Sequence, residues 1–336
     1  MADTPGLNPK ISLLVTAYNF EKYIGAAVES LLNQRGGYDY EVIVVDDCST
    51  DGTAAVMSRF SDPRLRYIRS EENRGAVWSA NHAFSLARGE YIARFDGDDV
   101  WYPWFLEETV PVLDLHPEVA LVYGDIHMVD GSGNVTREGI HRPDLPVQGN
   151  EFLPLLRRHY TCAPAMLGRR SAWESALPYP EALKSGLADW FLTLKMARGQ
   201  QFRFVPRALA QYRVHGGGMH HAFILNKKGE RNMRYILDYF SQLEGHTDGK
   251  QEMRKIYSLH YRQYGSSYFG ADMASDARRC FLEALRRDWS LLLDARFMFL
   301  LVGSLMGKQN YNKLKYYFSL KRNPNLLQER KSSMGI

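Results

Sequence analysis

The sequence is poor in cysteine and has no long hydrophobic run. Its three cysteines, Cys48, Cys162 and Cys280, are far apart and form no CxxC pair. Isolated cysteines in odd number predict neither a disulfide framework nor a cysteine-based zinc site. The longest apolar run, Phe297–Gly307, has 11 residues, whereas a membrane-spanning helix needs about 20. We therefore expect no membrane-spanning helix, which argues against a processive synthase that carries its own channel.

The sequence also lacks a strong excess of either charge. With 42 Lys and Arg against 38 Asp and Glu, the net charge is +4. Such a mild bias is compatible with an anionic ligand or a membrane surface but identifies neither. The first ten residues, MADTPGLNPK, contain no basic stretch followed by an apolar one, so we expect no signal peptide. These features favour a cytoplasmic protein.

The first half of the chain alternates strand and helix patterns. Buried strands are expected at 10–19, 40–47, 65–72, 90–96 and 119–130, with amphipathic helices between them. This alternation predicts an α/β fold with a doubly wound, mostly parallel sheet. The helix expected over 104–117 contains Pro111, which predicts an interruption there.

The second half of the chain becomes helical from about residue 220. We therefore predict an α/β domain over residues 1–220 and a helical C-terminal region over residues 221–336. Between Lys308 and Lys331, seven Lys and Arg residues stand against one acid. This segment is either a solvated basic helix or a peripheral contact with the anionic inner face of a membrane, where each basic residue adds roughly 1 kcal/mol.

Polar side chains gather where three of the expected strands end. In parallel α/β sheets, ligands bind outside the carboxyl ends of the strands. Three strand ends of this kind therefore point to one shared crevice. The residues are Thr16, Tyr18 and Asn19 after the first strand, Asp46 and Asp47 after the second, and Asp96, Asp98 and Asp99 after the fourth.

The three aspartates of the stretch FDGDDV allow three interpretations. They could be turn and cap residues, for which aspartate is common. The stretch DGDDV also fits the DxDxT/V pattern of haloacid-dehalogenase-like phosphotransferases, although in that family the motif usually follows the first strand of the core. Alternatively, Asp96 and Asp98 hold a divalent cation and a diphosphate, because Mg²⁺ and Mn²⁺ prefer oxygen ligands and would offset the negative charges.

Several motifs occur together and in order along residues 9–220. They are ISLLVTAYN, LLNQ, EVIVVDDCSTDGT, NRGAVWSANHAFSLARGEYIARFDGDD, ADWF and YRVHGGG. With them, the chain resembles the family 2 glycosyltransferases of the GT-A fold. The resemblance implies a nucleotide-binding half at about 9–130 and an acceptor-side half at about 131–220.

The resemblance also implies an activity. It is an inverting, metal-dependent transfer of a hexosyl group from a nucleotide-sugar, with UDP the expected nucleotide. The acceptor would be a glycan or a lipid-linked glycan in polysaccharide biosynthesis. No nucleic-acid partner is expected, and the C-terminal helices are candidates for a homo-oligomer contact.

The resemblance assigns the nucleotide to the first strand ends. Thr16, Ala17 and Tyr18 would line the base pocket. Asp47 would bind an N–H of the base, and Asp46 beside it would shape the loop. Arg74 would approach the base or the diphosphate.

The resemblance assigns the metal and the reaction to three further segments. Asp96 and Asp98 would form the DxD motif, with Asp96 near the ribose or a metal-bound water and Asp98 on Mn²⁺ or Mg²⁺. His215 would be a further metal or diphosphate ligand. Asp189 would be the general base that takes a proton from the acceptor hydroxyl, and Trp190 is a candidate for stacking on a sugar.

Two other functions stay open on the sequence alone: a non-catalytic nucleotide-sugar binding protein, and a haloacid-dehalogenase-like phosphotransferase. Arg94, which lies inside the strand before the DxD motif, has no role that the sequence explains.

Overall fold

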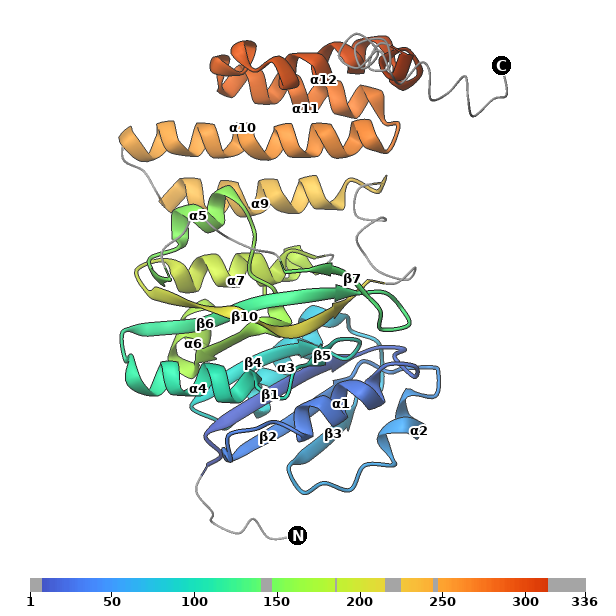
Figure 1. The fold of residues 1–336 in the computed structure, drawn as a ribbon, viewed down its shortest axis with the longest axis vertical. Coiled ribbons are helices and arrows are strands. Elements are labelled where there is room, and N and C mark those ends of the chain that lie inside the picture. Colours follow the sequence, from blue (N-terminus) through green and yellow to red (C-terminus); the bar gives the residue numbers. More distant parts are fainter. Residues whose placement is uncertain (1–7, 140–146, 185, 215–224, 244–246, 314–336) are drawn as a thin grey trace, which may run out of the picture. The chain divides into compact units, whose positions relative to one another are not determined.

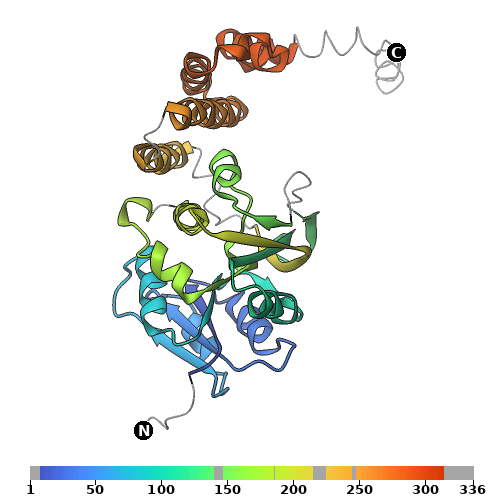
Figure 2. The ribbon, with the colours of Figure 1, turned by 90° about the vertical axis from the view of Figure 1, so that its left-hand side faces the viewer.

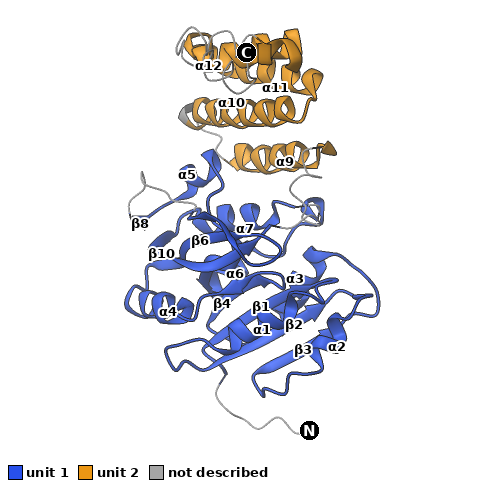
Figure 3. Cartoon of the chain, turned by 45° about the vertical axis from the view of Figure 1, so that its right-hand side comes forward, with its two compact units in different colours: residues 1–219 blue, residues 220–336 orange. Residues whose placement is uncertain are grey.

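The computed structural model describes residues 8–139, 147–184, 186–214, 225–243 and 247–313. The chain forms two compact units, Met1–Met219 and His220–Ile336 (Figure 3). The first unit is an α/β domain and the second is helical.

The first unit is built on one large sheet (Figure 1). Its strands are β1 (Ile11–Ala17), β2 (Tyr40–Asp46), β3 (Leu65–Arg69), β4 (Tyr91–Asp96), β5 (Val100–Trp101), β6 (Val119–Val129), β7 (Val135–Glu138), β8 (Gln148–Gly149), β9 (Met166–Arg169) and β10 (Gln201–Arg213). Its α-helices are α1 (Ile24–Leu32), α2 (Thr53–Met57), α3 (Ala76–Leu86), α4 (Phe105–Leu115), α5 (Phe152–Arg157), α6 (Arg170–Ala176) and α7 (Ala188–Ala197). Short 3-10 turns are η1 (Ala163–Ala165) and η2 (Glu181–Leu183).

The sheet is mostly parallel in its main path, β3-β2-β1-β4-β9-β6-β10-β5. The pairs β2/β3, β1/β2, β1/β4 and β6/β10 are parallel, whereas β9 runs antiparallel to both of its neighbours. Helices cover both faces of the sheet (Figure 2). The predicted α/β fold with a mostly parallel sheet is confirmed.

The central strands are buried over their whole length. Every residue of β1 and β2 is buried, which explains their almost continuous apolar sequences. One face of these strands packs with α1 and α4 in a core that contains Leu13, Val15 and Phe95. Each such side chain contributes roughly 1.5–3 kcal/mol by leaving water.

Helix α4 continues through Pro111 from Phe105 to Leu115, so the predicted interruption is wrong. A proline inside a helix removes one backbone hydrogen bond and crowds the preceding turn. Here, buried side chains lie on both sides of the proline, among them Val110 and Leu113. Their packing against the sheet outweighs the local cost.

The register of the parallel strands brings three strand ends to one edge of the sheet. Thr16 of β1 lies opposite Asp96 of β4. Ala17 of β1 lies opposite Asp46 of β2. The polar residues that follow these strands therefore start from neighbouring positions.

The second unit contains α9 (Lys228–Leu243), α10 (Thr247–Gly270), α11 (Ala274–Arg287), the 3-10 turn η3 (Trp289–Leu293) and α12 (Ala295–Met306). In its core, the rings of Phe281 and Phe297 meet edge to face at 5.6 Å. Glu230 is buried and accepts two hydrogen bonds of 2.6 Å from Arg279. No helix in the described part of the chain is long and apolar enough to span a membrane.

Candidate functional site

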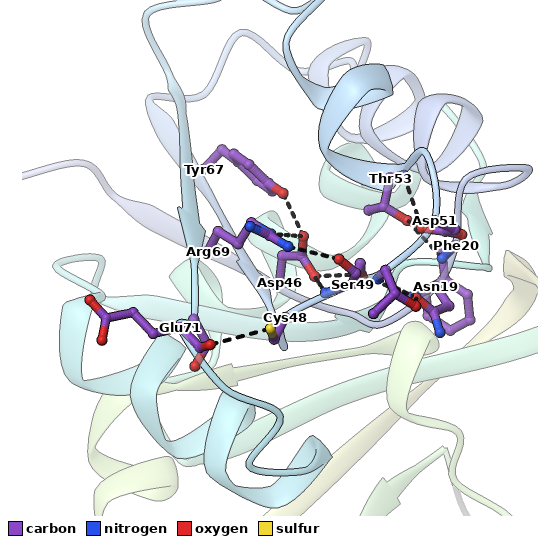
Figure 4. A network of polar contacts seen from close by, with 12 residues as sticks. Asn19, Phe20, Asp46, Cys48, Ser49, Asp51, Thr53, Tyr67, Arg69 and Glu71 are labelled. Atoms are coloured by element: carbon purple, nitrogen blue, oxygen red, sulfur yellow. Dashed lines mark hydrogen bonds and ion pairs between the residues drawn. The ribbon is translucent and has the colours of Figure 1, made fainter.

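A buried carboxylate fixes the loop that follows β2 (Figure 4). Asp46 is fully buried and accepts hydrogen bonds from the backbone N–H of Ser49 (2.9 Å) and the hydroxyl of Tyr67 (2.5 Å). Arg69 lies 3.8 Å from the same carboxylate. Burial, reinforced by Asp46, raises the pKa of Tyr67, so this phenol remains a donor. These contacts hold the loop in place, and a part for Asp46 in nucleotide binding stays a prediction.

The loop after β1 is tied to the loop after β2 by the same network (Figure 4). The backbone N–H of Asn19 donates to Ser49 Oγ at 2.9 Å, and Asn19 Oδ1 accepts from the N–H of Thr50 at 2.8 Å. Asn19 has a φ of 56°, a left-handed conformation that asparagine tolerates better than most residues. The two loops are therefore joined by hydrogen bonds at the edge of the sheet.

Asp47 anchors the segment that carries Arg74. Its Oδ1 accepts from the backbone N–H of Arg74 at 2.8 Å, and its Oδ2 from that of Gly75 at 2.7 Å. The guanidinium of Arg74 lies over the ring of Trp78 at 4.8 Å. Asp47 therefore lies against the backbone of Arg74, and the base and diphosphate roles of the two residues stay predictions. The backbone bonds give Asp47 an anchoring role that the sequence did not indicate.

The three residues expected to line a base pocket differ in exposure. Thr16 and Ala17 are buried, whereas the side chain of Tyr18 is exposed. Ala17 accepts a hydrogen bond from the N–H of Asp47, and Thr16 accepts one from that of Gly97. The backbone of this segment therefore connects both groups of aspartates, and Tyr18 is the side chain that a ligand can reach.

The DxD turn at the end of β4 is closely packed. A Cβ at Gly97 would lie 2.8 Å from Ile24 Cδ1 and 3.2 Å from Thr16 O, so the turn needs a small residue. Asp98 is partly buried and Asp99 is almost completely buried. Asp99 Oδ1 accepts from the N–H of Arg213 at 2.9 Å.

The other oxygen of Asp99, Oδ2, is buried and has no hydrogen-bond partner among the described residues. Burial raises the pKa of Asp99 well above its usual value, and Asp98 and Asp96 add to the effect.

The end of β10 clamps this turn. Arg213 Nε donates to the carbonyl of Asp98 at 2.8 Å, and its NH1 donates to the carbonyl of Asp130 at 3.0 Å. The YRVH motif therefore contributes through its arginine, which the sequence prediction left unassigned. The predicted ligand His215, two residues further, lies outside the described residues.

Asp189 lies in the first turn of α7 with its side chain 28% exposed. His159 Nε2 is 3.8 Å from Asp189 Oδ2. Burial lowers the pKa of His159, although the carboxylate of Asp189 opposes this. Leu187, just before the helix, has a φ of 64°, and such left-handed residues tend to occur at functional sites.

The predicted stacking of Trp190 on a sugar is wrong. Trp190 is 2% exposed, and its indole N–H donates to the carbonyl of Leu155 at 2.9 Å. Its ring stacks on that of His159. A helix directs neighbouring side chains about 100° apart, so Asp189 faces outward while the next residue enters the core.

Asp96 of the DxD turn and Asp189 of α7 influence the same set of side chains electrostatically. Both Asp96 and Asp189 contribute to the charge environment of Arg94, Cys162, Tyr179 and Tyr212. Burial, followed by the nearby carboxylates, raises the pKa of the Cys162 thiol well above its usual value. Burial also raises the pKa of both tyrosines. Asp96 and Asp189 therefore lie near the same four side chains, and their metal and base roles stay predictions.

Sequence reasoning missed several residues of this neighbourhood. His159, Cys162 and Tyr179 come from a stretch without a clear motif. Tyr179 is held by Asn81 of α3, whose Oδ1 accepts from its N–H at 2.9 Å. A partner 98 residues away leaves no local sequence signal.

The donor set at the DxD turn fits a hard divalent cation. It consists of carboxylate oxygens, one of which is the unpartnered Asp99 Oδ2. In the described residues, no three His, Cys, Asp or Glu side chains converge as a complete metal site. Mg²⁺ sites commonly use one or two carboxylates and take their other ligands from water and a bound phosphate. Asp96 and Asp98 are the residues that would hold such an ion.

Replacing Asp99 with asparagine is expected to stabilise the metal-free protein at neutral pH. The pKa of Asp99 is raised in the folded state, so the folded protein holds this proton above about pH 4, the ordinary pKa of the unfolded chain. The stability present below about pH 4 is therefore lost as the pH rises through the folded-state pKa. Asparagine removes this loss. We expect a gain of about 1–3 kcal/mol at pH 7 and little difference at pH 4, measured by urea unfolding in EDTA. A gain that is equal at both pH values would contradict this account.

The model for the family described as Glycosyl transferase family 2 matches residues 12–176. The chain carries a family 2 glycosyltransferase domain. This match covers β1 through α6, including the DxD turn. The predicted family is therefore confirmed, whereas the individual site roles stay predictions.

Related sequences come from bacteria and archaea. An uncharacterised protein of Mycobacterium tuberculosis is 28% identical over 229 residues, which cover 65% of this chain and 62% of the relative. The putative teichuronic acid biosynthesis glycosyltransferase TuaG of Bacillus subtilis is 29% identical over 208 residues, 61% of this chain and 79% of TuaG. The chain thus spans about three fifths of the length of the mycobacterial relative.

Solved glycosyltransferase structures share the fold. S. aureus TarS 1-349 in complex with UDP-GlcNAc superposes with a TM-score of 0.62 at 19% identity, covering 88% of this chain and 92% of that one. The mannosyltransferase PcManGT from Pyrobaculum calidifontis, in complex with GDP-Man and Mn²⁺, gives a TM-score of 0.54 at 19% identity, covering 90% and 86%. At this identity the likeness establishes the fold alone.

Proposed function

We propose that the protein is an inverting, metal-dependent glycosyltransferase that moves a hexosyl group from a nucleotide-sugar to a glycan or lipid-linked acceptor. The observation that carries the proposal is the common neighbourhood of Asp96 and Asp189, which act on the same four side chains. One carboxylate belongs to a metal-binding motif and the other begins a helix. A sugar between them would meet a leaving-group site on one side and a base on the other.

The nucleotide is proposed to bind at the edge formed by β1, β2 and β4. Tyr18 presents an exposed ring there, and Arg74 presents a partly exposed cation for the diphosphate. Asp47 already accepts two backbone hydrogen bonds, but each carboxylate oxygen has a second lone pair for a base N–H. UDP is the proposed nucleotide. The related folds were solved with UDP-GlcNAc and with GDP-Man, so a donor screen needs both.

Asp96 and Asp98 are proposed to hold Mn²⁺ or Mg²⁺ against the diphosphate. A bound cation would neutralise charge that develops on the departing nucleoside diphosphate. Asp98 is a partly exposed residue of the turn, and Arg213 donates a hydrogen bond to its backbone carbonyl. His215 is proposed as a further ligand from the segment that follows Arg213.

Asp189 is proposed to take the proton from the attacking acceptor hydroxyl. Its side chain is partly exposed, so a hydroxyl can reach it. A single attack from the side opposite the leaving group inverts the anomeric centre. The general base contributes typically 10²–10⁴-fold to such a reaction.

A role in polysaccharide biosynthesis beside a membrane is the broader proposal. Relatives include TuaG and the chondroitin synthase of Escherichia coli. In the second unit, η3 and α12 expose large apolar side chains: Trp289 (66% exposed), Leu292, Leu293 (91% exposed), Val302, Leu305 and Met306. The lysine- and arginine-rich segment from Lys308 to Lys331 follows directly. Exposed apolar side chains followed in the sequence by basic residues are the combination that binds an anionic lipid surface.

Replacing Leu293 with glutamate is therefore expected to weaken binding to vesicles of phosphatidylglycerol about tenfold. The change removes an apolar contact and adds a repelled charge. Vesicle sedimentation measures the effect, with Leu115→Glu, an exposed leucine of the first unit, as the control. If Leu293→Glu binds vesicles as the wild type does but no longer self-associates at concentrations where the wild type does, these side chains would instead contact a second copy of the chain.

The test of the function is a binding and turnover screen of UDP-, GDP- and dTDP-sugars with and without Mn²⁺. The proposal fails if the wild type neither binds nor turns over any of them. Binding without hydrolysis or transfer would favour the non-catalytic alternative. The family match over residues 12–176 argues against the haloacid-dehalogenase-like alternative, which predicts a phosphorylated Asp96.

A further inference from the structure

Arg94 occupies an unusual position for a charged side chain. It lies in the interior of β4, two residues before Asp96, so both side chains project from the same face of the sheet. Phe95 between them belongs to the apolar core on the other face. The Arg94 side chain is only 14% exposed. A charge buried to this extent is costly unless it is paired.

The pairing partner of Arg94 is the first aspartate of the DxD motif. Arg94 NH2 donates to Asp96 Oδ1 at 2.5 Å, and Thr16 Oγ donates to the same oxygen at 3.0 Å. Arg94 NH2 also lies 3.4 Å from Thr16 Oγ. These three groups form a triangle across the β1–β4 pair, in which Thr16 and Asp96 are opposite each other.

Both hydrogen bonds end on one oxygen of Asp96. Within the described residues, no hydrogen bond reaches Asp96 Oδ2, and the side chain is 32% exposed. The triangle therefore locks Oδ1 against the sheet and leaves Oδ2 available to a ligand. A free carboxylate at a strand end would rotate about χ2, because that torsion is broad.

A second buried arginine shows what a structural role looks like. Arg169 is 19% exposed, and its Nε and NH2 donate to the backbone carbonyls of Val119, Leu113 and His116. By contrast, Arg94 Nε is buried without an acceptor in the described residues. Arg94 is thus placed to donate to Asp96, although this position leaves its own Nε–H without an acceptor.

We propose that Arg94 is a positioning residue for the nucleotide–metal site. It fixes Asp96 through Oδ1 so that Oδ2 faces the nucleotide and its cation. The inference rests on the proposed function. It assigns a role to a residue outside the DxD pair, and it predicts that Arg94 acts through Asp96.

The test is a double-mutant cycle on nucleotide affinity. UDP, or GDP or dTDP if the screen selects it, is titrated calorimetrically with Mn²⁺ into the wild type, Arg94→Met, Asp96→Asn and the double variant. Loss of a hydrogen bond to a charged group predicts about 10- to 100-fold weaker binding for Arg94→Met. In a protein that already carries Asp96→Asn, adding Arg94→Met is expected to weaken binding by no more than about threefold. The carboxylate that Arg94 positions has then already lost its charge.

Three further variants separate positioning from folding. Arg94→Lys keeps the charge and one donor, so it should recover part of the affinity. Thr16→Val removes the second bond to Oδ1 and should weaken binding about threefold. Arg169→Met is the matched control: it should lower thermal stability and leave nucleotide affinity unchanged. In steady-state assays, the donor KM should rise more than kcat falls, since a positioning defect weakens donor binding before it affects chemistry.

Equal effects of Arg94→Met in both backgrounds would overturn the inference, as would wild-type affinity in a folded Arg94→Met protein. If Arg94→Met does not fold, wild-type affinity of both Arg94→Lys and Thr16→Val decides against it. In each of these cases the wild type still binds and transfers, and the proposed function stands. Loss of all binding and turnover in the wild type would overturn the function and this inference together.

Discussion

Sugar transfer is expected to fall by about 10²–10⁴-fold when Asp189 is replaced by asparagine. Asparagine has the same shape but cannot accept the proton of the attacking hydroxyl, and a general base contributes typically this much. The loss should appear in kcat, measured as release of the nucleoside diphosphate in the presence of acceptor. Because the nucleotide is proposed to bind at the ends of β1, β2 and β4, whereas Asp189 lies on α7 and is assigned only the proton transfer, donor affinity should stay within about twofold of the wild type.

The control for this variant is Asp114→Asn. Asp114 also pairs with a cation, Lys10 at 2.7 Å, but that pair lies at the amino end of β1. The Asp114→Asn variant should therefore retain the kcat of the wild type. An Asp189→Asn protein that keeps more than a tenth of the activity would remove Asp189 from the base role, and His159, 3.8 Å away, would be the next candidate to replace.

The second large effect is expected for Asp98→Ala, which should abolish the part of nucleotide affinity that depends on metal. Asp98 is a partly exposed residue of the turn, and losing a direct ligand should cost at least the 10- to 100-fold that is typical of outer-shell partners. Calorimetric titration of UDP with and without Mn²⁺ measures it. The variant with Mn²⁺ should bind as the wild type does in EDTA.

Asp62→Ala provides the comparison for Asp98→Ala. Asp62 pairs with Arg64 on the surface at 2.7 Å, so its loss should leave the Mn²⁺ effect intact. A Mn²⁺-dependent gain in affinity that is as large in Asp98→Ala as in the wild type would refute the DxD assignment. Reduced affinity in both the presence and absence of Mn²⁺ would instead indicate direct nucleotide contact by Asp98.

Local patterns were sufficient for the α/β alternation and for the family. Strands β1 and β2 are buried at every residue, so their apolar runs signalled strands without ambiguity. The same patterns gave a wrong prediction where tertiary packing outweighs the local helix propensity. Pro111 would end an isolated helix, but α4 continues because side chains on both sides of the proline are buried.

The sequence by itself determined the family, the α/β alternation and the polar residues at the ends of β1, β2 and β4, because strand ends and their polar residues are neighbours along the chain. Only the tertiary structure decided which residues face one another. Arg94 points at Asp96 because side chains two apart on a strand share a face and Thr16 stands opposite. Trp190 is in the core, Tyr179 is held from α3, and Arg213 clamps the DxD turn from 114 residues away. Those contacts depend on chain segments that meet only when the sheet forms, and no local pattern records them.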